Sequence, residues 1–419
     1  MLYREHLNAQ LRERREEFVS FEATWNASVG EYARRLRALG QRDSEEVRRA
    51  VKRAIETGGA KAAGALPSNE LERTGAFIVP FGEHWRSHEE ARRWALEVLA
   101  GRVTCAADGS QILPGREISL PVAAVQAAWF ENPHTRTGQD DYRKESRFRL
   151  VTPEELLTAE GGAATAADLV GLYRFELELT VLGEFLERHR GWRERGERVP
   201  VAFFDGTLLL STARVRVDAN IAPPAYVGAI IKAIKLSREA EVPLVGYIDQ
   251  SYARDLVRLL DVLSEDARPA SPVFDARLLS AVAPPAAAGD ETLFGAWGDR
   301  TIFCYCEREG LPPEFRDERD QPLMGFLYLQ TTGDGGVPAR IDIPAWVYEA
   351  GLLEEVVNTV RAECVVGNGY PYALETADAA AVITVHDREQ FLRAMQEFAA
   401  EQELCFRVSR KALSKSHRR

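Results

Sequence analysis

The sequence predicts a mixed α/β fold, and two features of the chain predict it. Apolar runs of strand length alternate with longer segments whose apolar residues have helical spacing. This alternation is typical of parallel strands joined by right-handed helical crossovers. In addition, three of the apolar runs end on an aspartate. Functional sites of such sheets gather beyond the carboxyl ends of the strands, so these aspartates are candidate site residues.

Length and composition set the class of protein. At 419 residues the chain has room for one large domain with insertions or for two domains. Hydrophobic residues at 45% and charged residues at 28% are typical of a soluble globular protein. A net charge of -11 argues against coating nucleic acid by bulk attraction, but not against an enzyme that holds cations in an acidic pocket.

The first hundred residues predict a helical region. Apolar residues at helical spacing predict long amphipathic helices over 4–39 and 44–57, and a further helix over 88–100. Such helices pack on their own domain, on a second subunit or on a partner. The chain begins with charged residues, and no apolar run has the length of a signal peptide or a membrane span, which predicts a cytoplasmic protein without membrane contact.

Two strands that end on Asp-Gly carry the argument about function. The run 103–107 leads into Asp108-Gly109-Ser110, and the run 199–204 leads into Asp205-Gly206. A single Asp-Gly after a strand is more typical of a hairpin turn. Two such endings weaken that explanation and favour a shared site.

The remaining elements follow the same alternation. Asp249 ends a third apolar strand over 242–248 and is interpreted first as the N-cap of a helix over 251–263, with metal binding as the alternative. Cys304 and Cys306 alternate on a predicted strand and are interpreted as buried filler. The other predicted elements are a strand over 118–130, a polar loop over 132–147, helices over 166–189, 226–240 and 373–384, a loop over 266–291, strands over 325–332 and 340–346, and a helix ending near 364.

Asp108 and Asp205 predict a divalent metal site. Neighbouring strands lie about 4.8 Å apart, so carboxylates on adjacent strand ends can reach one ion or an ion pair about 4 Å apart. Carboxylates are the hard oxygen ligands that Mg²⁺ and Mn²⁺ prefer. Hydrolysis of a phosphodiester bond needs such an arrangement.

A third ligand is expected from the helix over 166–189, where Glu176 and Glu178 compete. They point about 200° apart, so only one of them can face the site. Glu176 shares its face with apolar residues, whereas Glu178 lies four residues after Arg174 and can simply pair with it. We therefore expect Glu176 to be the ligand, with surface positions for both as the alternative.

These motifs together resemble the NurA family of DNA-repair nucleases. The resemblance rests on Asp108-Gly109-Ser110, on 204–208 (Phe-Asp-Gly-Thr-Leu), on 246–249 (Gly-Tyr-Ile-Asp), on 369–374 (Gly-Tyr-Pro-Tyr-Ala-Leu) and on a basic C-terminus. It implies an RNase H-like mixed sheet flanked by helices, with the nuclease domain over 101–419 and the helical extension over 1–100. It also implies Mn²⁺-dependent (or Mg²⁺-dependent) 5′–3′ exonuclease and single-strand endonuclease activity on DNA. The family likewise implies a homodimer that works with a HerA-type hexameric translocase in end resection and double-strand break repair.

The resemblance also assigns residues. Asp108 and Asp205 match the family's metal-binding aspartates, Glu176 best matches its helix glutamate, and Tyr370 matches the tyrosine of its Tyr-Pro motif. Tyr370 can stack on a base or hydrogen-bond a phosphate, although a buried aromatic beside a proline turn needs no such role. The basic stretch 407–419 is either a solvated tail or a phosphate-binding one.

One position departs from the family. Where the resemblance predicts Ala-His, this chain has Ala377-Asp378, and His386 lies farther on at an expected surface position. An ionised Asp can ligate Mn²⁺ but cannot donate a hydrogen bond, so either Asp378 is a substitute ligand or the histidine function is missing. Two alternatives therefore stay open: a metal-dependent phosphoesterase of small substrates, and a non-catalytic regulator of the translocase.

Overall fold

This computed structural model describes residues 3–115, 119–135, 142–160, 166–210, 222–264, 273–280, 293–333 and 336–404. The predicted basic tail 407–419 and most of the predicted loop 266–291 lie outside these ranges. The chain forms two compact units, which are described separately. The first comprises 1–84, 248–309 and 324–341, and the second comprises 85–247, 310–323 and 342–419.

Five neighbouring strands of a mixed sheet form the centre of the second unit. Their spatial order is β5-β4-β3-β6-β7. The strand β4 is antiparallel to β3 and β5, whereas β6 and β7 run parallel to β3. This is the strand order and direction of an RNase H-like core, which confirms the predicted fold class. The strands are β3 (Thr104–Ile112), β4 (Ala123–Asn132), β5 (Arg143–Val151), β6 (Val201–Asp205) and β7 (Leu244–Ile248).

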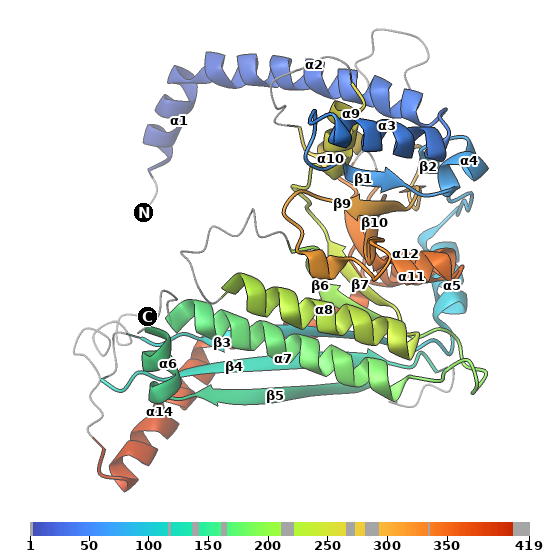
Figure 1. Cartoon of the computed structure of the whole chain (residues 1–419). Coiled ribbons are helices and arrows are strands. Elements are labelled where there is room, and N and C mark those ends of the chain that lie inside the picture. Colours follow the sequence, from blue (N-terminus) through green and yellow to red (C-terminus); the bar gives the residue numbers. More distant parts are fainter. Residues whose placement is uncertain are drawn as a thin grey trace. The chain divides into compact units, whose positions relative to one another are not determined.

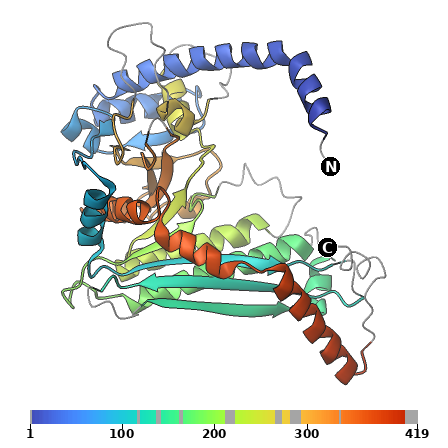
Figure 2. The same ribbon diagram turned by 180° about the vertical axis from the view of Figure 1, so that it is seen from behind.

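Helices cover both faces of this sheet. Figures 1 and 2 show α7 (Ala166–Arg188) and α8 (Ala222–Ala240) on one face, while the C-terminal helices cross the other. The helix α13 (Tyr372–Ala381) packs on β3 and β4, and its buried residues are small or apolar. The other elements of the unit are α5 (His88–Leu99), α6 (Pro153–Glu160), η1 (Pro313–Phe315), α11 (Ala345–Glu349), α12 (Leu353–Val366) and α14 (Val385–Glu401).

Two local predictions for this unit are wrong. The strand β3 does not end at Asp108 but continues to Ile112, so Gly109 lies inside a strand and not in a turn. The predicted loop over 132–147 overlaps the strand β5, whose nine residues include five charged ones. As an edge strand, β5 pairs with β4 on one side, so it carries few of the buried apolar residues from which a strand is predicted.

The first unit contains the N-terminal helices and antiparallel strands of the same sheet. The strand β9 pairs with β1 and β10, β8 pairs with β10 and β2, and Cys304 and Cys306 both face inward from β9, as predicted. The strands are β1 (Gly64–Pro67), β2 (Ile78–Val79), β8 (Arg300–Thr301), β9 (Cys304–Glu307), β10 (Met324–Leu329) and β11 (Ala339–Pro344), whose last residues belong to the second unit. The helices are α1 (Arg4–Glu13), α2 (Arg15–Leu39), α3 (Ser44–Glu56), α4 (Glu70–Thr74), α9 (Asp255–Val262) and α10 (Asp275–Leu279).

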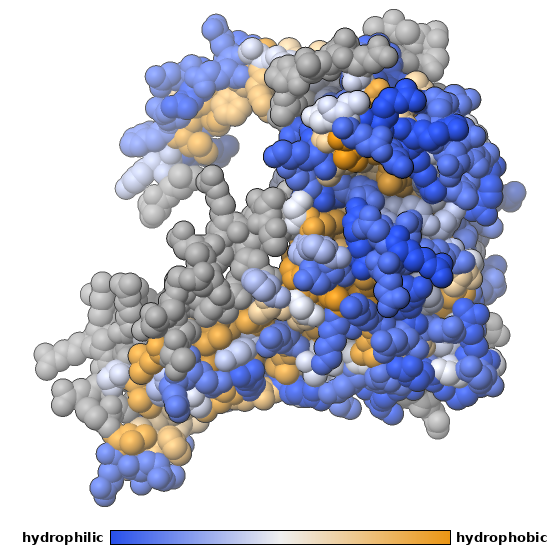
Figure 3. Space-filling view, viewed as in Figure 1, coloured by the Kyte–Doolittle hydropathy of each residue, from blue (hydrophilic) through white to orange (hydrophobic). Residues whose placement is uncertain are grey.

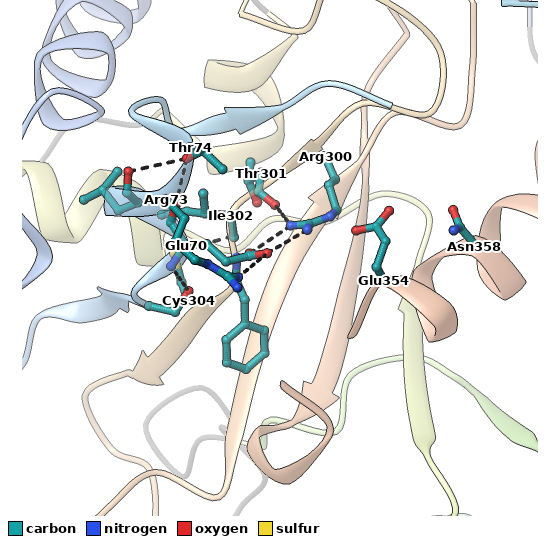
Figure 4. A network of polar contacts seen from close by, with 12 residues as sticks. Glu70, Arg73, Thr74, Arg300, Thr301, Ile302, Cys304, Glu354 and Asn358 are labelled. Atoms are coloured by element: carbon teal, nitrogen blue, oxygen red, sulfur yellow. Dashed lines mark hydrogen bonds and ion pairs between the residues drawn. The ribbon is translucent and has the colours of Figure 1, made fainter. Parts of the chain in front are cut away.

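A buried ion pair joins α4 to β8 in this unit. Figure 4 shows the guanidinium of Arg300 facing the carboxylate of Glu70. Arg300 Nη1 and Nη2 donate to Glu70 Oε2 and Oε1 at 2.9 and 2.7 Å, and the Phe303 amide donates to Oε2 at 2.8 Å. With both carboxylate oxygens satisfied, this pair has the fork geometry of a strong buried interaction.

The N-terminal helices leave apolar side chains exposed. The predicted helix over 4–39 is broken at Arg14 into α1 and α2. Figure 3 shows apolar residues on the surface of this arm, and they are Leu7, Leu11, Phe18, Val19 and Phe21. Within the described residues, no helix is long and apolar enough to cross a membrane.

Candidate active site

The strands β3 and β6 bring the two predicted aspartates side by side. These strands are parallel, and their last paired residues are Ala107 and Phe204. Asp108 and Asp205 follow directly, so they occupy one row of the sheet and point to the same face, on strands about 4.8 Å apart. Asp205 is exposed at the end of β6, where Gly206 turns the chain with φ 123°, and Asp108 is half-buried.

The face that carries these aspartates is the one covered by α13. Ser110, two residues after Asp108 and therefore on the same face, donates a hydrogen bond to the carbonyl of Ala381. The hydroxyl of Tyr370 donates to Asp205 Oδ1 at 3.1 Å. Asp378 is exposed on α13, and its carboxylate contributes to a raised pKa of Asp108. Asp108, Asp205, Tyr370 and Asp378 are thus brought together at one edge of the sheet.

Glu178 approaches the same place from the opposite face. A Cβ atom at Gly109 would lie 2.2 Å from Glu178 Oε1 and 2.6 Å from Arg174 Cγ. Because alternate strand residues point to opposite faces, Glu178 lies over the face of β3 opposite to that of Asp108. The missing side chain at Gly109 lets Glu178 reach the strand backbone, which explains why a glycine follows Asp108.

Glu176 lies elsewhere on α7. It is half-buried and lines a pocket between α7 and α8 together with Gly228 and Lys232. The structure therefore gives Glu178 the position that the sequence analysis expected for Glu176. The Arg174 pairing that argued against Glu178 is present, with Arg174 Nε 3.4 Å from Glu178 Oε1, but Glu178 is buried and not a surface acid.

Burial and mutual repulsion shift the acidities of these groups. Burial raises the pKa of Asp108 to about 6, helped by the charges of Asp378 and Asp205. Burial also raises the pKa of Glu178 to about 8, with Asp108 and Asp205 contributing. Arg174 opposes both shifts. The positive charge of Arg174 is therefore too weak to cancel these shifts, and carboxylates with strongly perturbed pKa values are common at functional sites.

The residues fit a divalent cation as its ligands. All candidate donors are carboxylate oxygens, and Glu178 Oε1 is buried without a hydrogen-bond partner among the described residues. Such an unsatisfied buried oxygen is costly, and a hard cation would satisfy it. As they stand, the described side chains contain no group of three His, Cys, Asp or Glu residues in metal-binding geometry. Binding an ion therefore requires these carboxylates to close in on it.

Asp249 is not the predicted N-cap. The helix α9 begins at Asp255, six residues later, and the carboxylate of Asp275 accepts hydrogen bonds from the amides of Leu256 and Val257. Asp275 thus satisfies the free amides of this helix. Asp249 is exposed and belongs to the first unit.

Sequence reasoning missed a positioning residue, Asp342. It is fully buried and accepts hydrogen bonds from the Thr207 hydroxyl at 2.6 Å and the Leu208 amide at 3.2 Å. Asp342 therefore holds the turn that follows Asp205. The available signal was a single acid inside the apolar run 341–343, since a buried acid needs a partner.

Comparison of the chain with solved structures finds weak likenesses. Three solved structures resemble it weakly: the catalytic domain of human Endonuclease V, the C-terminal lobe of a budding yeast Argonaute, and Kluyveromyces polysporus Argonaute with a guide RNA. Their identities are 15%, 12% and 11%, and their TM-scores are 0.29, 0.26 and 0.23. The alignments cover 78%, 74% and 68% of this chain and 95%, 52% and 27% of those chains. Likenesses of this strength carry no argument about function.

No curated protein matches the chain. A family model does match, namely the NurA domain, over residues 102–383. This match spans most of the second unit and includes Asp108, Glu178, Asp205, Tyr370 and Asp378. It implies a nuclease of the RNase H-like kind. The chain therefore belongs to the NurA family.

Proposed function

We propose that this protein is a metal-dependent deoxyribonuclease whose divalent ions are held by Asp108, Asp205, Glu178 and Asp378. The observation that carries the proposal is the pairing of Asp108 and Asp205 on adjacent parallel strands, beside a buried glutamate with a raised pKa. Mn²⁺ is the proposed ion, with Mg²⁺ as the alternative, because both prefer carboxylate oxygen. Glu178 replaces Glu176 in this proposal because it lies against Gly109 of β3.

Each residue has a distinct proposed part in the reaction. When bound, the metal supplies Lewis acidity toward the scissile phosphate and its attacking water. Asp108 and Asp205 would hold the metal from one face of the sheet, and Glu178 would hold it from the other. Tyr370 holds the Asp205 carboxylate through its hydroxyl. Because the ring of Tyr370 contacts Tyr247 edge to face, at 5.1 Å between centroids, this hydroxyl is held in place.

The finer activity rests on family membership. We propose a DNA substrate, 5′–3′ exonuclease and single-strand endonuclease action, a homodimer and a HerA-type translocase as partner in end resection. The acidic net charge means that DNA must reach the carboxylates through locally basic surface.

The test is cleavage of a 5′-labelled DNA strand with Mn²⁺ by Asp108→Asn, which keeps the shape of the side chain and removes its charge. We expect cleavage to vanish while the circular dichroism spectrum is unchanged. Glu375→Gln is the matched control, since Glu375 is an exposed acid on α13. Cleavage retained by Asp108→Asn would contradict the proposal. Hydrolysis of a chromogenic monoester but not of DNA, or ATPase stimulation without cleavage at any Mn²⁺ level, would favour the two alternatives.

A further inference from the structure

Arg174 occupies the place next to Glu178 where a cation is needed. Its Nε atom lies 3.4 Å from Glu178 Oε1, and its Nη1 atom donates to the carbonyl of Gly109 at 3.4 Å. Its charge also acts on Asp108. One guanidinium thus faces a carboxylate oxygen and a backbone carbonyl oxygen, which are the kinds of oxygen that a hard divalent ion takes.

The contacts of Arg174 are loose. Charge-assisted hydrogen bonds between arginine and carboxylate are normally about 2.7–2.9 Å long. Here both distances are 3.4 Å, and neither Arg174 Nε nor Glu178 Oε1 has a hydrogen-bond partner among the described residues. The Glu178 side chain is 7% exposed and fixed by burial, whereas that of Arg174 is 41% exposed. The arginine is therefore the member of the pair that can move into solvent.

Other arginines that contact or lie on α7 form tighter pairs. Arg147 of β5 holds Glu184 through two hydrogen bonds of 2.7 and 2.9 Å. Arg188, on the same helix, donates to Glu131 at 2.5 Å. The loose geometry at Arg174 is thus a local feature of the site and not a property of the whole helix.

We propose that Arg174 is an exchangeable counter-ion of the metal site. It contacts the Glu178 carboxyl group and acts electrostatically on Asp108 while no metal is bound, and it swings toward solvent when a divalent ion takes over the oxygens that it faces. Arg174 and the metal therefore compete, and Arg174 sets the metal affinity of the site. This inference rests on the proposed function, because it requires Asp108 and Glu178 to bind the metal.

The experiment is Mn²⁺ binding to the full chain without DNA, measured by calorimetry and by the metal-induced rise in melting temperature. For Arg174→Gln we expect the Kd for Mn²⁺ to fall about tenfold, because a competing positive charge is removed from the site. Its metal-free melting temperature falls, and its metal-induced rise is larger than that of the unaltered protein. Arg174→Lys, which keeps the charge, stays close to the unaltered protein.

Arg147→Gln is the matched control, because it removes one arginine that contacts α7 at an exposed ion pair. We expect it to leave the Kd unchanged. A Kd for Arg174→Gln that is unchanged or higher would overturn the inference and leave the proposed function intact. Absence of Mn²⁺ binding by the unaltered protein would instead overturn the proposed function, and the inference with it.

Discussion

Each unit of the molecule contains a cluster of carboxylates, and the two clusters are built differently. In the first unit, Asp255 accepts from Arg308 at 2.6 and 2.9 Å and from Arg340 at 2.7 Å. Asp275 accepts from two backbone amides and from the hydroxyl of Tyr328 at 3.1 Å. Two arginines thus compensate the charge of Asp255 through hydrogen bonds of normal length, whereas burial, with the charge of Asp255, raises the pKa of Asp275 to about 6.

The cluster in the second unit lacks this compensation. Besides burial, the charges of Asp378 and Asp205 raise the pKa of Asp108, and those of Asp108 and Asp205 raise the pKa of Glu178. The arginine that opposes these shifts, Arg174, lies 3.4 Å from Glu178. The acidities differ accordingly. Although burial opposes ionisation, Arg308 and Arg340 hold the pKa of Asp255 down to about 2, whereas burial raises the pKa of Glu178 to about 8.

The difference separates a structural network from a binding site. A cluster that supplies its own cations leaves no buried charge uncompensated, so removing one partner is strongly destabilising. A cluster with too few cations stores unfavourable electrostatic energy, which a metal ion can relieve on binding. The comparison therefore predicts that replacing an aspartate by asparagine lowers the stability in the first unit but not in the second.

The largest expected effect is on stability in the first unit. Asp255→Asn leaves Arg308 and Arg340 buried without their shared anion, and this costs about 3–5 kcal/mol of the free energy of unfolding. Urea denaturation measures it, with Glu46→Gln as the control, because the exposed pair of Glu46 with Arg42 contributes at most about 1 kcal/mol. Asp108→Asn, in contrast, leaves stability unchanged or raises it. Equal losses in Asp255→Asn and Asp108→Asn would erase the distinction.

The next effect is on cleavage and separates two glutamates of one helix. Glu178→Gln lowers DNA cleavage at least about 100-fold, since even residues behind metal ligands cost about 10–100-fold. Glu176→Gln, on the other side of α7, changes the rate less than about twofold. Single-turnover kinetics at saturating Mn²⁺ measures both rates. The reverse ranking would return the ligand role to Glu176.

The two glutamates also show how far the sequence could predict the site. Apolar runs ending in Asp located Asp108 and Asp205, because strand propensity and the period of two are local properties. The choice between Glu176 and Glu178 depends on the rotation of α7 about its axis. The packing of α7 on β3 and on α8 decides this rotation. The sequence also suggested that Glu178 simply pairs with Arg174, but Glu178 is buried, and the space that it occupies comes from a glycine on another element.

The fold shows the same limit. The parallel strands β6 and β7 were predictable because they are buried on both faces and continuously apolar. The edge strand β5 was missed because many of its residues are charged. It pairs with β4 on one side only, so it needs fewer buried apolar residues. The grouping of 248–309 and 324–341 with the N-terminal residues was also hidden, since it depends on pairings such as Ala65 with Cys306 across more than half of the chain.

A smaller effect is expected from filling the space at Gly109. In Gly109→Ala the new Cβ meets Glu178 and Arg174, so the free energy of unfolding falls by about 1–3 kcal/mol, and cleavage falls as well. Gly228→Ala is the matched control, because no atom lies within 4 Å of its added Cβ and α8 gains a better helix former. Thermal unfolding and a cleavage assay compare the two variants. Full activity in Gly109→Ala would mean that Glu178 need not lie against β3.

The last expected effect is the pH dependence of the metal-free protein. Because the folded pKa of Glu178, about 8, lies above its ordinary value of 4.5, the folded state keeps a proton that the unfolded chain loses. Its contribution is therefore fully present below pH 4.5 and is lost as pH rises toward 8, by at most about 1.4 kcal/mol per pH unit. Asp255 has the opposite sign, since its contribution is present above pH 3.8 and is lost as pH falls toward 2.

Urea denaturation at pH 5, 6.5 and 8, with and without Mn²⁺, measures this dependence. We expect Mn²⁺ to restore the stability lost at pH 8, because the ion favours ionised carboxylates. In Glu178→Gln the loss between pH 5 and 8 shrinks. A metal-free protein whose stability rises steadily from pH 5 to 8 would contradict the assignment of Glu178 as an under-neutralised acid.

The most direct test of the metal site is anomalous diffraction from crystals soaked in Mn²⁺. We expect an anomalous peak between the carboxylates of Asp108 and Asp205, with Glu178 as a further ligand and the Arg174 side chain displaced. A soaked crystal without a peak there, or with Mn²⁺ bound by Glu176, would contradict this expectation.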